Sequence, residues 1–161
     1  MIKTSIWYLS IVFIGLLLFT SLLSGCVRKA KPVTQDELVI KLERTACFGT
    51  CPVYSLKING NGTVVYEGKD FVRIKGVEET TVGPEIIDQL LQAFEETGYF
   101  SLNDSYTGFG KSDMPSAYTS ISIGNHTKSI KHYLGDLSAP KKLTDLEHKI
   151  DTIVNSAQWI K

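Results

Sequence analysis

The chain has 161 residues, and its 17 basic and 17 acidic side chains give a formal net charge of zero. Because no excess of basic residues is available to neutralise phosphates, the composition argues against nucleic acid as a partner. The length corresponds to a short leader followed by one domain that is large enough to bury its own core.

Residues 1–25 predict an export signal of the bacterial lipoprotein type. Lys3 precedes an uncharged run from Ile6 to Leu23, which leads directly into Leu23-Ser24-Gly25-Cys26. This tetrapeptide resembles the bacterial lipobox, in which the cysteine thiol receives a diacylglyceryl group and the peptide is cleaved before the cysteine. The resemblance implies that Cys26 becomes the first residue of the mature protein. Its acyl chains, of the palmitate type, would then anchor the protein in the membrane.

The predicted anchor places the domain in the cell envelope, on the extracytoplasmic side of a membrane. Val27 follows the cysteine, as in lipoproteins that are passed on to the outer membrane and face the periplasm of bacteria with two membranes. Residues 26–37 are predicted to form a lipidated tether, because their Arg, Lys and Pro residues lack apolar periodicity. An uncleaved transmembrane helix is the alternative, since the uncharged run just reaches the length that spans a bilayer.

Residues 38–161 are predicted to form a single domain that begins with four strands. Leu38–Arg44 is rich in β-forming residues, and residues 53–58 alternate between apolar and polar side chains. The turn cluster 59–62 then leads into a partner strand over residues 63–67. Residues 71–75 alternate again, which predicts a fourth strand of the same meander.

Two helices and a second hairpin are expected in the rest of the domain. Pro84 opens a helix that continues to Glu96 and stops at Gly98, and Pro140 opens a final helix. Between them we expect a long polar loop over residues 101–116 and a hairpin of residues 117–123 and 127–133. One apolar stripe is expected on each helix: Ile87, Leu90, Leu91 and Phe94, and then Leu143, Leu146, Ile150, Ile153, Ala157 and Ile160. The order ββββ-α-ββ-α predicts an α+β fold, an antiparallel sheet with both helices packed on one face.

Two segments of this domain resemble a known family. Cys47-Phe-Gly-Thr-Cys51-Pro-Val-Tyr54 is followed by the Gly-rich hairpin Gly62-Thr-Val-Val-Tyr66-Glu-Gly68. Together they resemble an uncharacterised bacterial domain-of-unknown-function family that is often found in lipoproteins and carries a Cys-x-Gly-x-Cys-Pro-x-Tyr motif. The resemblance extends over residues 38–155. It implies a fold and a membership but no activity.

Cys47 and Cys51 are the two cysteines that remain if Cys26 is acylated, and export would place them where disulfides form. A fully extended segment would hold them about 13 Å apart, too far for a bond. Gly49 and Thr50 can supply a turn that brings them together. We therefore expect a structural Cys47–Cys51 disulfide.

Two other uses of this cysteine pair stay open. Cys-x-x-x-Cys-Pro resembles the copper motif of membrane-anchored copper chaperones with a thioredoxin-like fold, in which a downstream histidine completes the site. The resemblance would make Cys47, Cys51 and His132 copper ligands, and thiolate and imidazole suit copper. In that family the motif precedes a helix, whereas here Pro52 leads into a predicted strand. A redox-active dithiol is the second alternative, although Cys-x-x-Cys is its more usual spacing.

Other polar residues give no catalytic signature. Gly108-Phe-Gly-Lys-Ser112 resembles a phosphate loop but lacks its first glycine, and neither a Gly-x-Ser-x-Gly elbow nor a His-Glu-x-x-His pair occurs. His126 and His148 are predicted to be surface histidines. Asp104 and Asp113 are predicted to be solvated loop acids that could also bind a cation. Tyr54 and Tyr66 are predicted to form a packed pair.

Together these features predict a membrane-anchored extracytoplasmic lipoprotein with a non-enzymatic envelope role. We expect it to bind a ligand or an envelope protein that the sequence does not identify, without a cofactor or a metal. A copper-binding or thiol-redox protein that uses Cys47 and Cys51 is the alternative.

Overall fold

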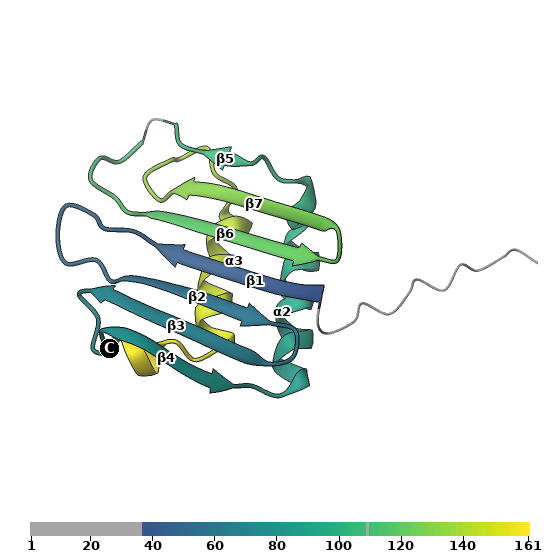
Figure 1. The fold of residues 1–161 in the computed structure, drawn as a ribbon. Coiled ribbons are helices and arrows are strands. Elements are labelled where there is room, and N and C mark those ends of the chain that lie inside the picture. The colour runs from purple at the N-terminus through teal and green to yellow at the C-terminus, as the bar shows by residue number, and fades with distance from the viewer. Residues whose placement is uncertain (1–36, 109) are drawn as a thin grey trace, which may run out of the picture. The chain divides into compact units, whose positions relative to one another are not determined.

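The structure is a computed structural model that describes residues 37–108 and 110–161. The predicted signal 1–25, the predicted lipidation site Cys26 and the tether up to residue 36 lie outside the described residues. Seven strands form one sheet in the order β4-β3-β2-β1-β6-β7-β5 (Figure 1). They are β1 (Leu38–Arg44), β2 (Val53–Asn59), β3 (Thr63–Asp70), β4 (Gly76–Thr81), β5 (Ser105–Tyr106), β6 (Ser116–Ile123) and β7 (His126–Tyr133).

The central strand of the sheet is β1. It pairs antiparallel with β2 on one side and with β6 on the other, so that Leu42 lies between Leu56 and Thr119. The remaining neighbours are also antiparallel, except for the short β5, which runs parallel to β7. The meander β1–β4 therefore extends the sheet to one side of β1, and the hairpin β6–β7 extends it to the other.

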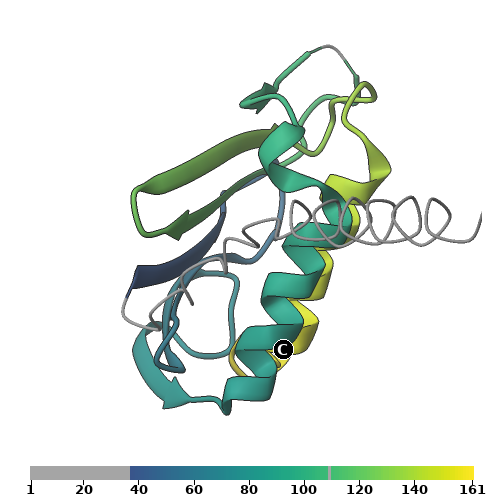
Figure 2. The same cartoon turned by 90° about the vertical axis from the view of Figure 1, so that its right-hand side faces the viewer.

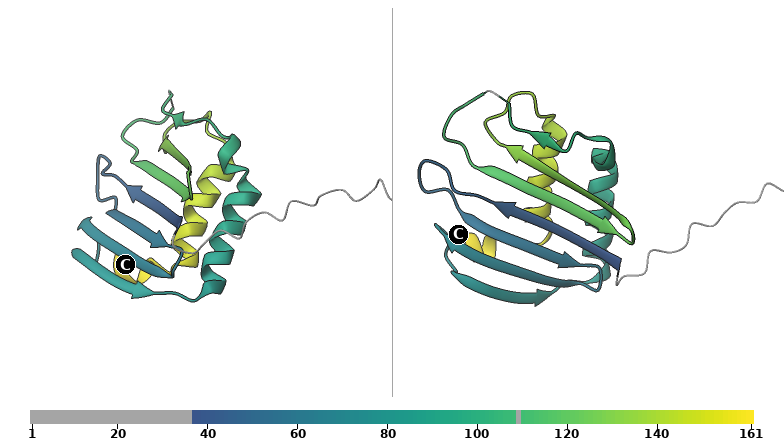
Figure 3. Two further views of the ribbon diagram at one scale, coloured as in Figure 1. Left: turned by 45° about the vertical axis from the view of Figure 1, so that its right-hand side comes forward. Right: turned by 45° about the horizontal axis from the view of Figure 1, so that its top comes forward.

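Two long helices, α2 (Pro84–Thr97) and α3 (Lys141–Ile153), cover one face of this sheet. They lie side by side behind the strands in Figure 1, and the side view in Figure 2 shows both on the same side. The two oblique views of Figure 3 show the same arrangement. The predicted α+β fold, with two helices on one face of an antiparallel sheet, is confirmed.

The core lies between the sheet and the two helices. Side chains alternate along each inner strand, so that every second residue of β1, β2 and β3 faces the helices and is buried. Helix α3 contributes Leu143, Leu146 and Ile150, each fully buried. Burying one such side chain stabilises the fold by roughly 1.5–3 kcal/mol.

The expected strand over residues 71–75 is wrong. These residues form a bend, in which the N–H groups of Arg73 and Ile74 donate to the carbonyls of Ile160 and Trp159 at 3.2 and 2.9 Å. Val72 and Ile74 pack against the core, which explains their alternation with polar residues. The fourth strand is instead β4, an edge strand whose side chains are almost all exposed.

The expected single final helix is interrupted. Helix α3 ends at Ile153, Asn155 adopts a positive φ of 54°, and the short helix α4 (Ala157–Ile160) follows. The interruption buries Trp159 and leaves Ala157 exposed, contrary to the predicted stripe. Trp159 stacks on Tyr66 with ring centroids 5.0 Å apart, and Tyr66 packs on Tyr54 at 5.9 Å, which confirms the predicted tyrosine pair.

The segment after α2 contains more regular secondary structure than the expected polar loop. Gly98 ends α2 with a φ of 63°, a conformation that glycine adopts at little cost, and its N–H donates to the Glu95 carbonyl at 2.8 Å. The 3-10 turn η3 (Tyr99–Ser101) ends where the expected loop begins, and β5 lies within that loop. Among the described residues, no helix is both long and apolar enough to cross a membrane.

Candidate functional site

The Cys47–Cys51 loop connects the end of β1 to the start of β2. Its two sulfurs lie at bonding distance, and the Cα atoms are 5.7 Å apart, within the range that a disulfide needs. The tip of the loop carries Phe48, whose side chain is 89% exposed and whose N–H donates to the Asp113 carbonyl at 3.1 Å. The loop thus brings the two cysteines together as the structural prediction requires.

Replacing both cysteines with serine is expected to lower the free energy of unfolding by about 2 kcal/mol, because the unfolded chain loses the restraint of a small closed loop. For a domain of this size, that loss lowers the melting temperature by about 7 °C. Thermal unfolding of the wild type and the C47S/C51S variant, followed by circular dichroism, measures the difference. Thiol trapping on wild type purified without reductant is the companion measurement. Two freely alkylated cysteines would reject the disulfide and favour the copper or redox alternative.

Next to this loop, Arg44, Tyr54 and Asp151 form a hydrogen-bonded cluster, which we call the Arg44 cluster. Arg44 and Tyr54 are register partners at the ends of β1 and β2, and Asp151 reaches them from α3. Arg44 Nη2 and Nε donate to Asp151 Oδ2 at 2.7 and 3.1 Å, and Nε also donates to the Tyr54 hydroxyl at 3.0 Å. The Tyr54 hydroxyl and Ser156 Oγ both donate to Asp151 Oδ1 at 2.7 Å.

The surroundings of Arg44 and Tyr54 shift the pKa values of both side chains. Burial works to lower the pKa of the Arg44 guanidinium, but the negative charge of Asp151 raises that pKa above its ordinary value. The pKa of the Tyr54 hydroxyl is also raised, first by burial and then by Asp151, while Arg44 opposes the shift. Arg44 therefore stays charged, and Tyr54 stays neutral and serves as a hydrogen-bond donor.

The Arg44 cluster lines an open cavity of about 500 Å³, a volume in the usual range of small-ligand sites. The lining combines the cluster with three further groups of side chains. They are apolar Pro52, Ala157 and Ile160, basic His148 and Lys161, and polar Thr152, Asn155 and Ser156. We call this space the Arg44 cavity.

Comparison with protein families decides the affiliation of this fold. One family model, the domain of unknown function DUF6438, matches residues 38–154. The chain belongs to the DUF6438 family. The match confirms the predicted membership of an uncharacterised family, and it includes Arg44, Tyr54 and Asp151. A search of curated proteins finds no relative of the chain.

A second polar pair lies deep in the DUF6438 domain, where sequence reasoning expected none. His132 Nδ1 and Glu147 Oε1 are 2.9 Å apart, and the two residues are 2% and 0% exposed. The Tyr99 hydroxyl, which donates to the Thr119 carbonyl at 2.6 Å, has its pKa raised by burial and by the charge of Glu147. Within the described part of the chain, Glu147 Oε2 has no hydrogen-bond partner. Glu147 is thus a buried carboxylate whose one close partner is His132.

The buried position of His132 does not fit the copper-ligand role that it would share with Cys47 and Cys51. Its Nδ1 is engaged by Glu147 beneath α3, while the two cysteines lie in the loop between β1 and β2. A search of residues 37–108 and 110–161 finds no group of three His, Cys, Asp or Glu side chains placed to hold a metal ion. Pro52 leads directly into β2, so the motif precedes a strand, as expected, and not a helix.

The other predicted site residues of the DUF6438 domain lie apart from the Arg44 cluster, with one exception. His126 is exposed at the start of β7, Asp104 pairs with Lys128, and Asp113 meets the cysteine loop through its backbone carbonyl alone. His148 is exposed on α3, as predicted, and is the exception because it lines the Arg44 cavity.

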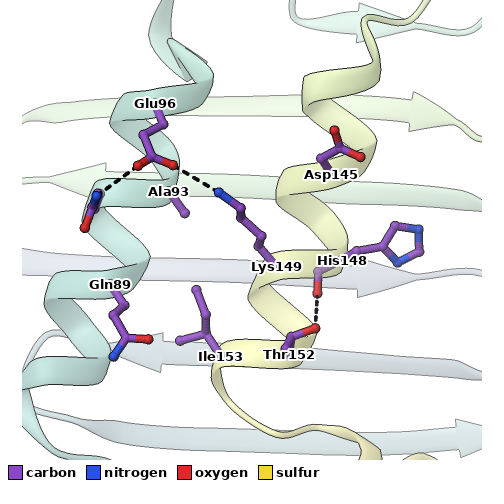
Figure 4. Close-up of a pocket in the computed structure, with 9 residues that line it drawn as sticks. Gln89, Ala93, Glu96, Asp145, His148, Lys149, Thr152 and Ile153 are labelled. Atoms are coloured by element: carbon purple, nitrogen blue, oxygen red, sulfur yellow. Dashed lines mark hydrogen bonds and ion pairs between the residues drawn. The ribbon is translucent and has the colours of Figure 1, made fainter.

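A second hollow of about 570 Å³ lies in the groove between α2 and α3 (Figure 4). Glu96 on α2 accepts hydrogen bonds from Gln92 at 2.9 Å and from Lys149 of α3 at 3.0 Å. These bonds, that from Lys149 foremost, lower the pKa of Glu96. Figure 4 shows Lys149 reaching across to Glu96 and the His148 ring pointing away from α2. This groove is a solvated helix junction whose charged groups already pair with each other.

Sequence reasoning missed Arg44, Glu147 and Asp151. A signal for the two acids was present, because Glu147 and Asp151 are four residues apart and so lie on one face of α3. Each directly follows a member of the apolar stripe, Leu146 or Ile150. An acidic side chain at the edge of an apolar stripe can point toward the core when a hydrogen-bond partner lies opposite it in the sheet.

Proposed function

We propose that this protein is a lipid-anchored, extracytoplasmic DUF6438 domain that binds a ligand in the Arg44 cavity and does not transform it. The observation that carries the binding role is the state of the polar groups in the cluster. Asp151 accepts four hydrogen bonds, and the Tyr54 hydroxyl both donates one and accepts one. The hydrogen bonds to Asp151 occupy the lone pairs that a general base would need, and the raised pKa of Tyr54 keeps its hydroxyl neutral.

The position of the cavity in the fold supports a binding role for an anchored protein. Leu38 begins β1 and Arg44 ends it, so the cavity lies at the end of the central strand opposite to the entry of the preceding chain. If Cys26 carries the lipid, the twelve residues 26–37 that precede Leu38 can extend about 40 Å. Such a tether lets the domain present the cavity away from the membrane surface.

The experiment that tests the anchor is substitution of Cys26 by serine. Metabolic labelling with a fatty-acid analogue is expected to label the wild type and to leave Cys26→Ser unlabelled and uncleaved, because serine lacks the thiol that receives the lipid. The matched control is Cys47→Ser, which removes a thiol of the domain and should keep full labelling. Equal labelling of wild type and Cys26→Ser would reject the lipoprotein proposal, whatever the cavity binds.

A further inference from the structure

We propose that the Arg44 cavity recognises an anion, a carboxylate attached to an apolar group, and that Arg44 Nη1 is its principal contact. This inference rests on the proposed binding function of the cavity and specifies the class of ligand. It follows from the donors that the cluster leaves free, from their direction and from the apolar part of the lining.

The Arg44 guanidinium has donors that the cluster does not use. An arginine side chain has five N–H groups in a fixed planar fork. Arg44 uses Nε toward Tyr54 and Asp151, and it uses Nη2 toward Asp151 and the Glu147 carbonyl at 3.1 Å. Nη1 donates to no group in the described residues, and it is not a buried, unsatisfied atom. The two N–H groups of Nη1 are therefore open donors of a residue that lines the cavity.

The free donors of Arg44 lie on a different side of the guanidinium from Asp151. Nε and Nη2 form the side of the guanidinium that holds Asp151, and planarity puts Nη1 on another side of the group. An anion bound at Nη1 would thus lie away from the Asp151 carboxylate, whose acceptor positions are already filled. Lys161 lines the same cavity, and its basic side chain adds attraction for an anion.

The Arg44 side chain is held in place by the folded domain itself. The Arg44 side chain is only 13% exposed and is held by Tyr54, Asp151 and the backbone of α3. Because these contacts fix the guanidinium before a ligand arrives, binding would immobilise little additional side-chain freedom. An arginine held in this way gives a specific anion contact, whereas a flexible surface lysine gives a weak one.

The apolar part of the lining selects the rest of the ligand. Pro52, Ala157 and Ile160 line the same space, beside the ring of Tyr54. A bare inorganic anion would leave this surface uncovered, whereas an apolar group attached to the carboxylate would remove it from water. Benzoate is a small probe that has both parts, benzamide lacks the charge, and acetate lacks the larger apolar body.

The test is a nitrogen-15 NMR titration of the full-length protein in non-ionic detergent, with labelled arginine. The chain has three arginines, so Arg28 and Arg73 serve as internal controls for Arg44. Benzoate is expected to shift the Arg44 side-chain signals in a saturable way and to leave the two controls unchanged. Benzamide, acetate and inorganic phosphate are each expected to bind at least tenfold more weakly.

Two variants complete the test. Arg44→Lys should weaken benzoate binding at least tenfold, and Arg73→Lys should not change it. Because Arg44→Lys can disturb folding, Lys161→Glu provides a surface alternative that should weaken benzoate but not benzamide. Equal binding of benzamide and benzoate would overturn the anion claim and leave a binding cavity in place. Phosphate binding as tight as benzoate would overturn the apolar part, and no shift with any probe would overturn the proposal while leaving the Cys26 result intact.

Discussion

Replacing His132 with alanine is expected to lower the free energy of unfolding by about 3–5 kcal/mol, because the fully buried Glu147 carboxylate then loses its partner. A loss of that size is a large share of the 5–15 kcal/mol that typically stabilises a domain. Urea unfolding followed by tryptophan fluorescence measures it, since Trp159 is buried and stacks on Tyr66 in the folded domain.

Two further variants test whether loss of the buried pair causes this destabilisation. His126→Ala, at an exposed histidine of the same strand, should change stability by less than about 0.5 kcal/mol. The double variant His132→Leu with Glu147→Leu should be more stable than His132→Ala, because it removes both polar partners and fills the space with apolar side chains. If His132→Ala unfolds at the same urea concentration as His126→Ala, the buried pair does not contribute as the structure implies.

Replacing Asp151 with alanine is expected to cost about 3 kcal/mol, because the partly buried Arg44 would keep its charge and lose the carboxylate that compensates it. The same change removes the acceptor of the Tyr54 and Ser156 hydroxyls. Since both hydroxyls are then left with unpaired donors, the cost exceeds that of a single surface ion pair. Urea unfolding of the purified variant measures the loss.

The matched control for this prediction lies on the same helix. Asp145 also bonds a basic side chain, Lys141, but this pair is exposed and connects residues four apart on α3. Asp145→Ala should therefore cost no more than about 0.5 kcal/mol. A similar loss in Asp145→Ala and Asp151→Ala would mean that the Arg44 cluster stabilises the domain no more than a surface pair does.

The fold was predictable from the sequence where burial leaves a clear pattern. The hairpin of β2 and β3 has a glycine-rich turn and one buried face, and α2 has a stop at Gly98, so both were placed correctly. β4 was missed because nearly all of its side chains are exposed. Such an edge strand does not need to alternate between apolar and polar residues. The bend over residues 71–75 alternates because Val72 and Ile74 pack on the core, and this mimics the signature of a strand.

The candidate site was less predictable, because its residues meet only in the folded domain. Arg44 and Asp151 are 107 residues apart, and a basic residue at the end of a strand is usually solvated. The cysteine pair was found because its partners lie within one loop. His132 was singled out by the resemblance to a copper motif, but its pairing with Glu147 depends on how α3 docks on β7.

The central position of β1 also has a mechanical consequence. Residue 37 leads into β1, which is hydrogen-bonded to β2 on one side and to β6 on the other. A pull transmitted through the preceding chain therefore acts along the middle of the sheet and strains both ladders in shear. In shear the bonds of a ladder yield together, whereas a pull across the edge strand β4 would open its ladder one bond at a time. The segment that joins the proposed anchor to the domain thus enters where the sheet best resists tension.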